Sequence, residues 1–397
     1  MRIGIEAFRI FRNHKHGMDI VAIEQIKKLQ SLDKINTYYL FCFHGPDHFL
    51  IQESENFKII RLPRLPSPFM EQVILPILSF AYQLDLLHST GNTSPLFLSC
   101  KRLITLHDII YLENNECSFG GSIYQKIGKW YRRQVVPIVI KKAEMLVTVS
   151  ASEQRTIENF SPELIGKVCC IYNAVSSHFM LKPIAQTLTS ALHYKLPREP
   201  YILFHGNTDP KKNTINVLKA FDIFKRKSDS KIKLVITDLS SGVLNQLLKN
   251  HQLSGLKSEI HLTNYVHNSE MPDLYNRALI YLYPSLRESF GIPLLEAMAC
   301  GTPVITSDCS AMPEIAGGSA LLANPASPEN IADAILKLYK DEKLRWMYTQ
   351  RGLERVRNFN WHSSTEKLLQ LYSTLLKPAL SKTPNLSKSE GQPAFTS

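Results

Sequence analysis

Two glutamates separated by seven residues stand in the stretch from residue 283 to residue 301, read YPSLRESFGIPLLEAMACG. Glu288 lies in a turn-like segment, and Glu296 lies on the helix predicted to follow. Carboxylates accept hydrogen bonds from hydroxyl groups, so Glu296 is placed to hold a ribose and Glu288 a second sugar. The N-terminus of a helix also binds anions, because its first N–H groups have no partner within the helix. Phosphate would be repelled by the two carboxylates unless hydroxyl groups lay between them, and a nucleotide-sugar has that order of parts.

The elements around the glutamates are well marked in the sequence. An apolar strand is predicted at residues 278–283, and a second strand at residues 303–306. Between them we expect a helix with Ser289 as its cap, Pro293 in its first turn and Gly301 at its end. The amides of Phe290, Gly291 and Ile292 would face the anion, and the glycine would let a ligand approach the backbone.

The same stretch resembles the E-x7-E signature of the retaining glycosyltransferases of family 4, which have the GT-B fold. The segment from Glu288 to Val304 follows that signature almost residue for residue. The resemblance implies a nucleotide-sugar donor, with Glu288 near the transferred sugar and near the reaction centre. The alternative is a buried strand, loop and helix with two surface glutamates, but buried carboxylates need partners.

A second stretch has the features of a diphosphate site. A buried strand from Tyr201 ends at Gly206 and is followed by Asn207 and by Lys211 and Lys212 before a helix. Backbone amides, a helix dipole and lysine charges would converge there on phosphate. The stretch resembles the family's Gly-Arg…Lys element, in which Lys212 matches the lysine and Asn207 replaces the arginine. An ordinary surface turn is the alternative reading.

Three further segments resemble motifs of the same family less closely. Gly17 alone represents the family's glycine-rich loop near the donor phosphates, and an ordinary turn is equally consistent with it. His107, followed by Asp108 at the end of an apolar strand, resembles the family's His-Asp pair near the donor sugar. Tyr265 and Val266 lie where family members contact the nucleobase through the backbone.

Other polar residues at predicted strand ends and loops allow several roles. His88 and Asn92 are candidate acceptor-side groups or, on a second reading that we favour, turn-forming residues. Asn264 can adopt a left-handed conformation in place of glycine. Glu314, in a loop that the family has beside the donor, is expected to be structural.

Strand and helix patterns alternate along nearly the whole chain, which predicts parallel sheets with crossover helices. We expect an α/β protein with two Rossmann-like domains facing a cleft, and a C-terminal helix that crosses back to the first domain. The predicted divisions are an acceptor domain at 1–185, a linker at 186–200, a nucleotide-sugar domain at 201–360, a crossover helix at 361–377 and a disordered tail at 378–397.

The composition is that of an ordinary globular protein of 397 residues, with a net charge of +11. The positive excess is spread over both halves, and no nucleic-acid-binding signature is present, so nucleic acid is not an expected partner. Seven cysteines without paired spacing, together with a first strand in place of a signal peptide, favour a cytoplasmic location.

A basic and aromatic helix is predicted at residues 123–143. Its lysines, arginines and aromatic residues suit an anionic membrane surface, and such contact would bring a lipid-linked acceptor within reach. A solvated amphipathic face is the plainer alternative.

The expected reaction is retaining transfer of a hexosyl group, mannosyl from GDP-mannose by resemblance, to a glycan or lipid-linked acceptor in surface polysaccharide or lipopolysaccharide synthesis. No Asp-x-Asp motif is present, so neither a metal nor another cofactor is expected. A glycosidase, a binding protein on a decayed transferase fold and an epimerase of the same fold are the alternatives.

Overall fold

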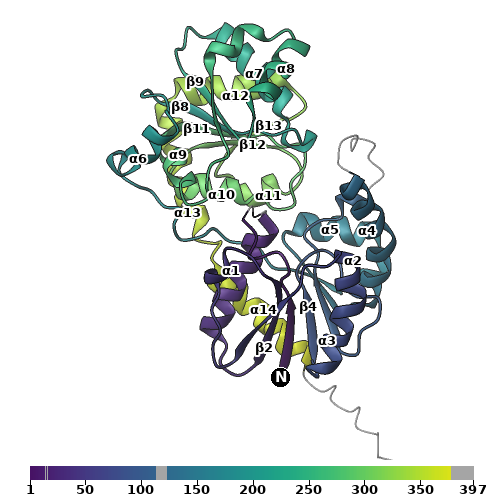
Figure 1. Ribbon diagram of the computed structural model, residues 1–397. Coiled ribbons are helices and arrows are strands. Elements are labelled where there is room, and N and C mark those ends of the chain that lie inside the picture. The colour runs from purple at the N-terminus through teal and green to yellow at the C-terminus, as the bar shows by residue number, and fades with distance from the viewer. Residues whose placement is uncertain (14, 16, 113–122, 377–397) are drawn as a thin grey trace, which may run out of the picture.

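The structure is a computed structural model that describes residues 1–13, 15, 17–112 and 123–376. The tail predicted to be disordered at 378–397 therefore lies outside the described residues. Two domains, each built on a parallel sheet, face one another in Figure 1.

The first domain has a seven-stranded sheet in the order β3-β2-β1-β4-β5-β6-β7, and every neighbouring pair is parallel. This order reverses at β1, and ligands bind parallel sheets at such switch points. The elements are β1 Arg2–Glu6, α1 Gly17–Leu32, β2 Thr37–Phe43, β3 Phe57–Leu62, α2 Ser67–Phe69, the π-turn η2 Met70–Ile74, α3 Leu75–Ala81, β4 Leu86–Ser89, β5 Lys101–Thr105, α4 Ile123–Lys142, β6 Met145–Thr148, α5 Ala151–Phe160 and β7 Val168–Cys170.

The second domain has a six-stranded parallel sheet in the order β10-β9-β8-β11-β12-β13. Its elements, with the segment leading into it, are α6 Leu188–His193, β8 Tyr201–His205, the short 3-10 turn η6 Pro210–Lys212, α7 Thr214–Lys227, β9 Lys233–Thr237, α8 Ser241–Asn250, β10 Ile260–Asn264, α9 Met271–Arg277, β11 Ala278–Tyr283, α10 Ile292–Ala299, β12 Val304–Ser307, α11 Met312–Ala316, β13 Leu321–Ala323, α12 Pro328–Lys340 and α13 Glu342–Val356. Both sheets are parallel, as the alternating pattern predicts.

The last helix, α14 Trp361–Leu376, returns to the first domain and lies beside α1 (Figure 1). The Tyr372 hydroxyl lies 2.7 Å from His88 Nδ1, and His88 Nε2 lies 2.7 Å from the Thr105 hydroxyl. The predicted crossover helix is therefore confirmed. His88 is neither an acceptor-side group nor a turn residue, because it is buried and ties α14 to the sheet. Asn92, with φ +69°, is a turn-forming residue, as we expect from the sequence.

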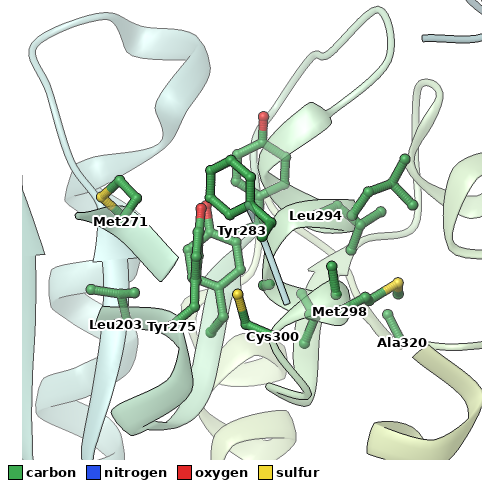
Figure 2. Close-up of a cluster of buried hydrophobic side chains, with 14 of the residues drawn as sticks. Leu203, Met271, Tyr275, Tyr283, Leu294, Met298, Cys300 and Ala320 are labelled. Atoms are coloured by element: carbon green, nitrogen blue, oxygen red, sulfur yellow. The ribbon is translucent and has the colours of Figure 1, made fainter. Parts of the chain in front are cut away.

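The helix that carries Glu296 is fixed by an apolar cluster behind it. Leu203 of β8, Tyr275 of α9, and Leu294 and Met298 of α10 are almost fully buried and belong to one cluster (Figure 2). Burial of a leucine of this kind contributes about 2 to 3 kcal/mol. The cluster leaves Glu296 on the helix face that turns away from the core.

Two local predictions differ from the structure. Ser289 makes no cap on α10, since Gly291 is the N-cap residue, with φ +90°. The segment predicted to be a linker contains α6, which Ser190 attaches to Asp273 of α9 by a 2.6 Å hydrogen bond.

Candidate functional site

A cleft of about 790 Å³ lies at the facing edges of the two sheets and is lined by both domains. The β1–α1 loop and the start of α1 line one side, and the carboxyl ends of strands of the second sheet line the other. Seven of the residues predicted to bind the donor or its base line it together: Gly17, Gly206, Asn207, Lys212, Tyr265, Ile292 and Glu296. The structure thus brings most of the predicted donor-site residues to one place.

Glu296 lies in the second turn of α10, with its carboxylate toward the cleft. The Tyr275 hydroxyl donates a hydrogen bond of 3.3 Å to Glu296 Oε2. Burial raises the pKa of Glu296 to about 7, and the hydrogen bond from Tyr275 opposes this rise. A buried carboxylate of this kind binds hydroxyl groups strongly, because it has little water to exchange for them.

Glu288 forms an ion pair with Lys212, and the Oε1–Nζ distance is 2.7 Å. Only 12% of the Glu288 side chain and 19% of the Lys212 side chain are exposed. Burial opposes the charge of Glu288, but the Lys212 ammonium holds its pKa below the ordinary value. The Lys212 ammonium also lies 5.1 Å from the centre of the Tyr283 ring, so the cation is held at the edge of the cleft.

The turn after β8 brings backbone close to the cleft. A Cβ on Gly206 would lie 2.5 Å from Ile236 Cγ2, so the close packing of β8 on β9 requires glycine here. The Asn207 side chain accepts from the Asp209 N–H at 2.9 Å, and it therefore shapes the turn. Lys211 lies 3.8 Å from Asp209 in an exposed ion pair.

The loop before α10 is fixed by its own glycine and by an aromatic side chain. A Cβ on Gly291 would lie 2.4 Å from the Met312 methyl group, in a left-handed conformation that already favours glycine. Phe290 is buried, and its ring packs against those of Tyr172 and Phe359. Neither Phe290 nor Gly291 is among the residues lining the cleft, whereas Ile292 is.

The residues predicted to meet the nucleobase differ in exposure. Tyr265 is 47% exposed and lines the cleft, whereas the Val266 side chain is buried. Asn264 has φ +57°, which confirms the left-handed conformation expected from the sequence.

His107 lies at the end of β5 in the first domain and does not line the cleft. Its ring nitrogen Nε2 lies 3.1 Å from the Thr90 carbonyl, and its backbone N–H donates to Asn92 Oδ1 at 2.6 Å. Burial lowers the pKa of His107 to about 4, so the imidazole is neutral at physiological pH. Burial raises the pKa of the adjacent Asp108, and Lys211 of the second domain opposes this rise across the domain boundary.

Glu314 makes the clearest bridge between the domains. Its two carboxylate oxygens accept hydrogen bonds of 2.7 Å from the N–H groups of Ala151 and Ser152, at the N-terminus of α5. The Ser150 hydroxyl, in the same turn, donates to the Ser289 carbonyl at 2.6 Å. The expected structural role of Glu314 is thus a cap on a helix of the other domain.

Two residues beside Glu296 escape notice in the sequence. Tyr275 contacts its carboxylate, and His205 lines the cleft next to Gly206. The sequence does contain a signal for His205, because a histidine at the end of an otherwise apolar strand is a candidate site residue. Tyr275 has no such signal, because it occupies an ordinary apolar position of a short helix.

Among the residues that the structure describes, no group of three or more histidine, cysteine, aspartate or glutamate side chains is arranged to hold a metal ion. The described helices also include none that is both long and apolar enough to span a bilayer.

Comparisons with known proteins agree with this geometry. Residues 193–355 match the family model described as glycosyl transferases group 1. O-antigen chain mannosyltransferase B of Escherichia coli is 29% identical over 59% of this chain and 62% of its own length. O-antigen chain mannosyltransferase RfbU of Salmonella typhimurium is 29% identical over 62% of this chain and 63% of its own length. The chain thus spans less than two thirds of either relative.

Among solved structures, HepE of Anabaena, in complex with UDP and glucose, is similar with a TM-score of 0.72. The identity is 14%, and the likeness covers 94% of this chain and all of the other. The fold is therefore GT-B, with two Rossmann-like domains, as the sequence predicts. The family match together with this fold supports a group 1 glycosyltransferase.

Proposed function

We propose that this protein is a retaining glycosyltransferase of family 4 that moves a hexosyl group from a nucleotide-sugar to a hydroxyl group of a growing glycan. The observation that carries the proposal is the shared cleft, in which Glu296 and Lys212 of one domain face Gly17 of the other. The names of the two O-antigen mannosyltransferases favour mannose from GDP-mannose and a role in surface polysaccharide synthesis.

In this proposal the donor lies along the edge of the second sheet. Glu296 accepts hydrogen bonds from the ribose hydroxyls, and Tyr265 and Val266 flank the base. Lys212, next to the glycine turn at Gly206, meets the diphosphate. Glu288 does not itself line the cleft. It anchors Lys212 through their 2.7 Å ion pair, and in this proposal it lies near a hydroxyl of the transferred sugar.

The chemistry needs stabilisation of the leaving group more than a strong base. The bond between the anomeric carbon and the phosphate oxygen breaks, and charge develops on the nucleoside diphosphate. Lys212 and the N-terminus of α10, which begins at Ile292, stabilise that charge. The acceptor oxygen bonds to the same face of the sugar, and its proton passes to the departing phosphate. His107 of the first domain joins the site when the cleft closes. No metal or other cofactor takes part in this scheme.

The acceptor side is proposed to work at the cytoplasmic face of an anionic membrane. Helix α4 exposes Ile127, Trp130 and Ile138 along its outer side, and Trp130 is 64% exposed. The neighbouring π-turn and α3 expose Val73, Ile77 and Phe80. The Tyr131 hydroxyl joins the two segments by a 2.9 Å bond to Glu71, so α4 and the π-turn are neighbours in the first domain.

These segments would suit a bilayer because apolar side chains could enter it, and the lysine and arginine side chains that accompany them on α4 could contact anionic headgroups. Such contact would hold a lipid-linked glycan near the cleft. The test is sedimentation with vesicles of phosphatidylglycerol and phosphatidylcholine. The double variant Trp130→Ser, Phe80→Ser should lose binding to them, and binding that persists would contradict this placement.

The donor site is tested by thermal shift with nucleoside diphosphates and nucleotide-sugars in the presence of EDTA. A ligand at 100 times its dissociation constant adds about 2.7 kcal/mol of stability. One base family should stabilise the wild type and should fail to stabilise Glu296→Ala. If no nucleotide raises the melting temperature of the wild type, the assignment of the donor site is contradicted, and a binding protein for another ligand becomes the favoured function.

A further inference from the structure

Three polar side chains that have no part in the proposed reaction lie in line behind Glu296. The Tyr275 hydroxyl lies 3.3 Å from Glu296 Oε2, and His205 Nε2 lies 2.6 Å from the Tyr275 oxygen. Thr237 Oγ1 lies 2.6 Å from His205 Nδ1. The three residues come from α9 and from the carboxyl ends of β8 and β9, so their positions are set by separate elements of the second domain.

The direction of the hydrogen bonds in this line is determined by chemistry. Burial, helped by the nearby charge of Lys212, lowers the pKa of His205 to about 3, so the ring is neutral and carries one N–H. An ionised Glu296 only accepts, so the Tyr275 hydroxyl donates to it. The Tyr275 oxygen then accepts from His205 Nε2–H, and Nδ1 accepts from the hydroxyl of Thr237. In each of the three hydrogen bonds the donor is therefore the residue farther from Glu296 along the line.

The two glutamates of the site are therefore held in different ways. Glu288 is bound by the cation of Lys212, whereas the Glu296 carboxylate receives a hydrogen bond from neutral Tyr275. A neutral donor orients a carboxylate without neutralising its charge, and that charge strengthens hydrogen bonds accepted from hydroxyl groups. The edge-on packing of the Tyr275 ring against the rings of His205 and Tyr281 keeps the donor in one rotamer.

We infer that Thr237, His205 and Tyr275 are positioning residues that orient the Glu296 carboxylate to accept from both ribose hydroxyls of the donor. This inference rests on the proposed function, since it requires a nucleotide in the cleft. It adds a determinant of ribose recognition that lies outside the E-x7-E stretch.

The experiment compares nucleoside diphosphates with their 2′-deoxy counterparts, because the missing hydroxyl reports on Glu296 directly. Calorimetry gives the dissociation constants of GDP, UDP and ADP and of the matching 2′-deoxy compounds. For the base that binds, the wild type should prefer the ribose form about 10- to 100-fold, as expected for a hydrogen bond to a charged group. In His205→Phe and in Tyr275→Phe this preference should fall toward one, because the ribose form loses more affinity than the 2′-deoxy form, which has only its 3′-hydroxyl to offer Glu296.

A double variant distinguishes a connected line from separate effects. If His205 acts through Tyr275, adding His205→Phe to Tyr275→Phe should produce no further loss of ribose preference. Tyr201→Phe is the matched control, because it removes a buried hydroxyl on β8 that donates to the Leu274 carbonyl at 2.8 Å, outside the line. It should keep the wild-type preference.

Two outcomes would overturn the inference in separable ways. If the wild type prefers the ribose form and both phenylalanine variants keep that preference, the positioning role is wrong and the donor site stands. Equal weakening of the ribose and 2′-deoxy forms would likewise show a general structural role. If the wild type binds none of the six compounds, the proposed function fails and the inference fails with it.

Discussion

Replacing Lys212 with methionine removes the cation that neutralises a buried glutamate. The side chains of Lys212 and Glu288 are 19% and 12% exposed, with their charged atoms 2.7 Å apart. Removing one partner of a buried ion pair costs about 3 to 5 kcal/mol, because the other charge stays buried without compensation. Because both side chains keep some contact with solvent, we expect Lys212→Met to lose an amount near the lower value, about 3 kcal/mol of unfolding free energy at pH 8.

The cost should depend on pH with a definite sign. In the wild type the pKa of Glu288 lies below its ordinary value, so the pair stabilises the fold above the unfolded pKa and loses this contribution as pH falls through the folded one. In Lys212→Met the effect of burial, the largest one on Glu288, is opposed only by Lys211 and the Tyr283 hydroxyl. We expect that pKa to rise, so that the folded variant takes up a proton more readily than the unfolded chain. The destabilisation of the variant relative to the wild type should therefore shrink on acidification. It should fall by about 1.4 kcal/mol per pH unit between the Glu288 pKa of the folded variant and that of the folded wild type.

Urea unfolding followed by circular dichroism at pH 8 and pH 5 measures both effects. The double variant Lys212→Met, Glu288→Gln removes the buried charge and should recover most of the lost stability at pH 8. The reasoning is refuted if the single variant loses under 0.5 kcal/mol, on the order of an exposed ion pair, or if the double variant is no more stable than the single one.

Three further predictions follow from the site and its supports. Because burial raises the pKa of Glu296 to about 7, affinity for a nucleoside diphosphate should fall up to about tenfold per pH unit below pH 7; calorimetry should find a weaker dependence in Glu296→Gln. Glu314→Ala deletes the bridge to α5 and should loosen the domains, which small-angle scattering would detect as a larger radius of gyration; an unchanged radius would argue against the bridge. Gly291→Ala should lower the free energy of unfolding by about 1 to 3 kcal/mol, since the new methyl group meets Met312. Gly318→Ala, with φ +78° and open space around its Cβ, is the control that carries backbone strain alone in urea unfolding.

The sequence predicts the fold well because its signals are local and periodic. Strand β11 has the bounds expected from its apolar run, and Gly301, with φ +76°, has the left-handed conformation expected at the end of α10. The cap of α10 is predicted wrongly for a tertiary reason. The Ser289 carbonyl receives a hydrogen bond from Ser150 of the other domain, and a left-handed Gly291 begins the helix instead.

Contacts between distant residues account for most of what the sequence does not reveal about the site. Glu288 and Lys212 are each singled out by motif, but their pairing depends on the packing of the η6 turn beside the end of β11. The bond from Tyr275 to Glu296 depends in the same way on how α9 packs against α10. His88 illustrates the opposite error, since its strand-end position suggests chemistry whereas its partner is Tyr372 of the returning helix.

The return of α14 makes the second domain an insertion in the first, so the chain passes between the domains twice. The two passages lie side by side, because the rings of Tyr172 and Phe359 are 5.6 Å apart. Two adjacent connections define a hinge axis between the domains. A rotation of one domain about the line through both connections stretches neither of them, whereas a twist perpendicular to that line would pull the two connections apart. Phe290, in the loop before α10, packs against both rings. A rotation about this line that closed the cleft would therefore have its pivot in contact with the loop before α10.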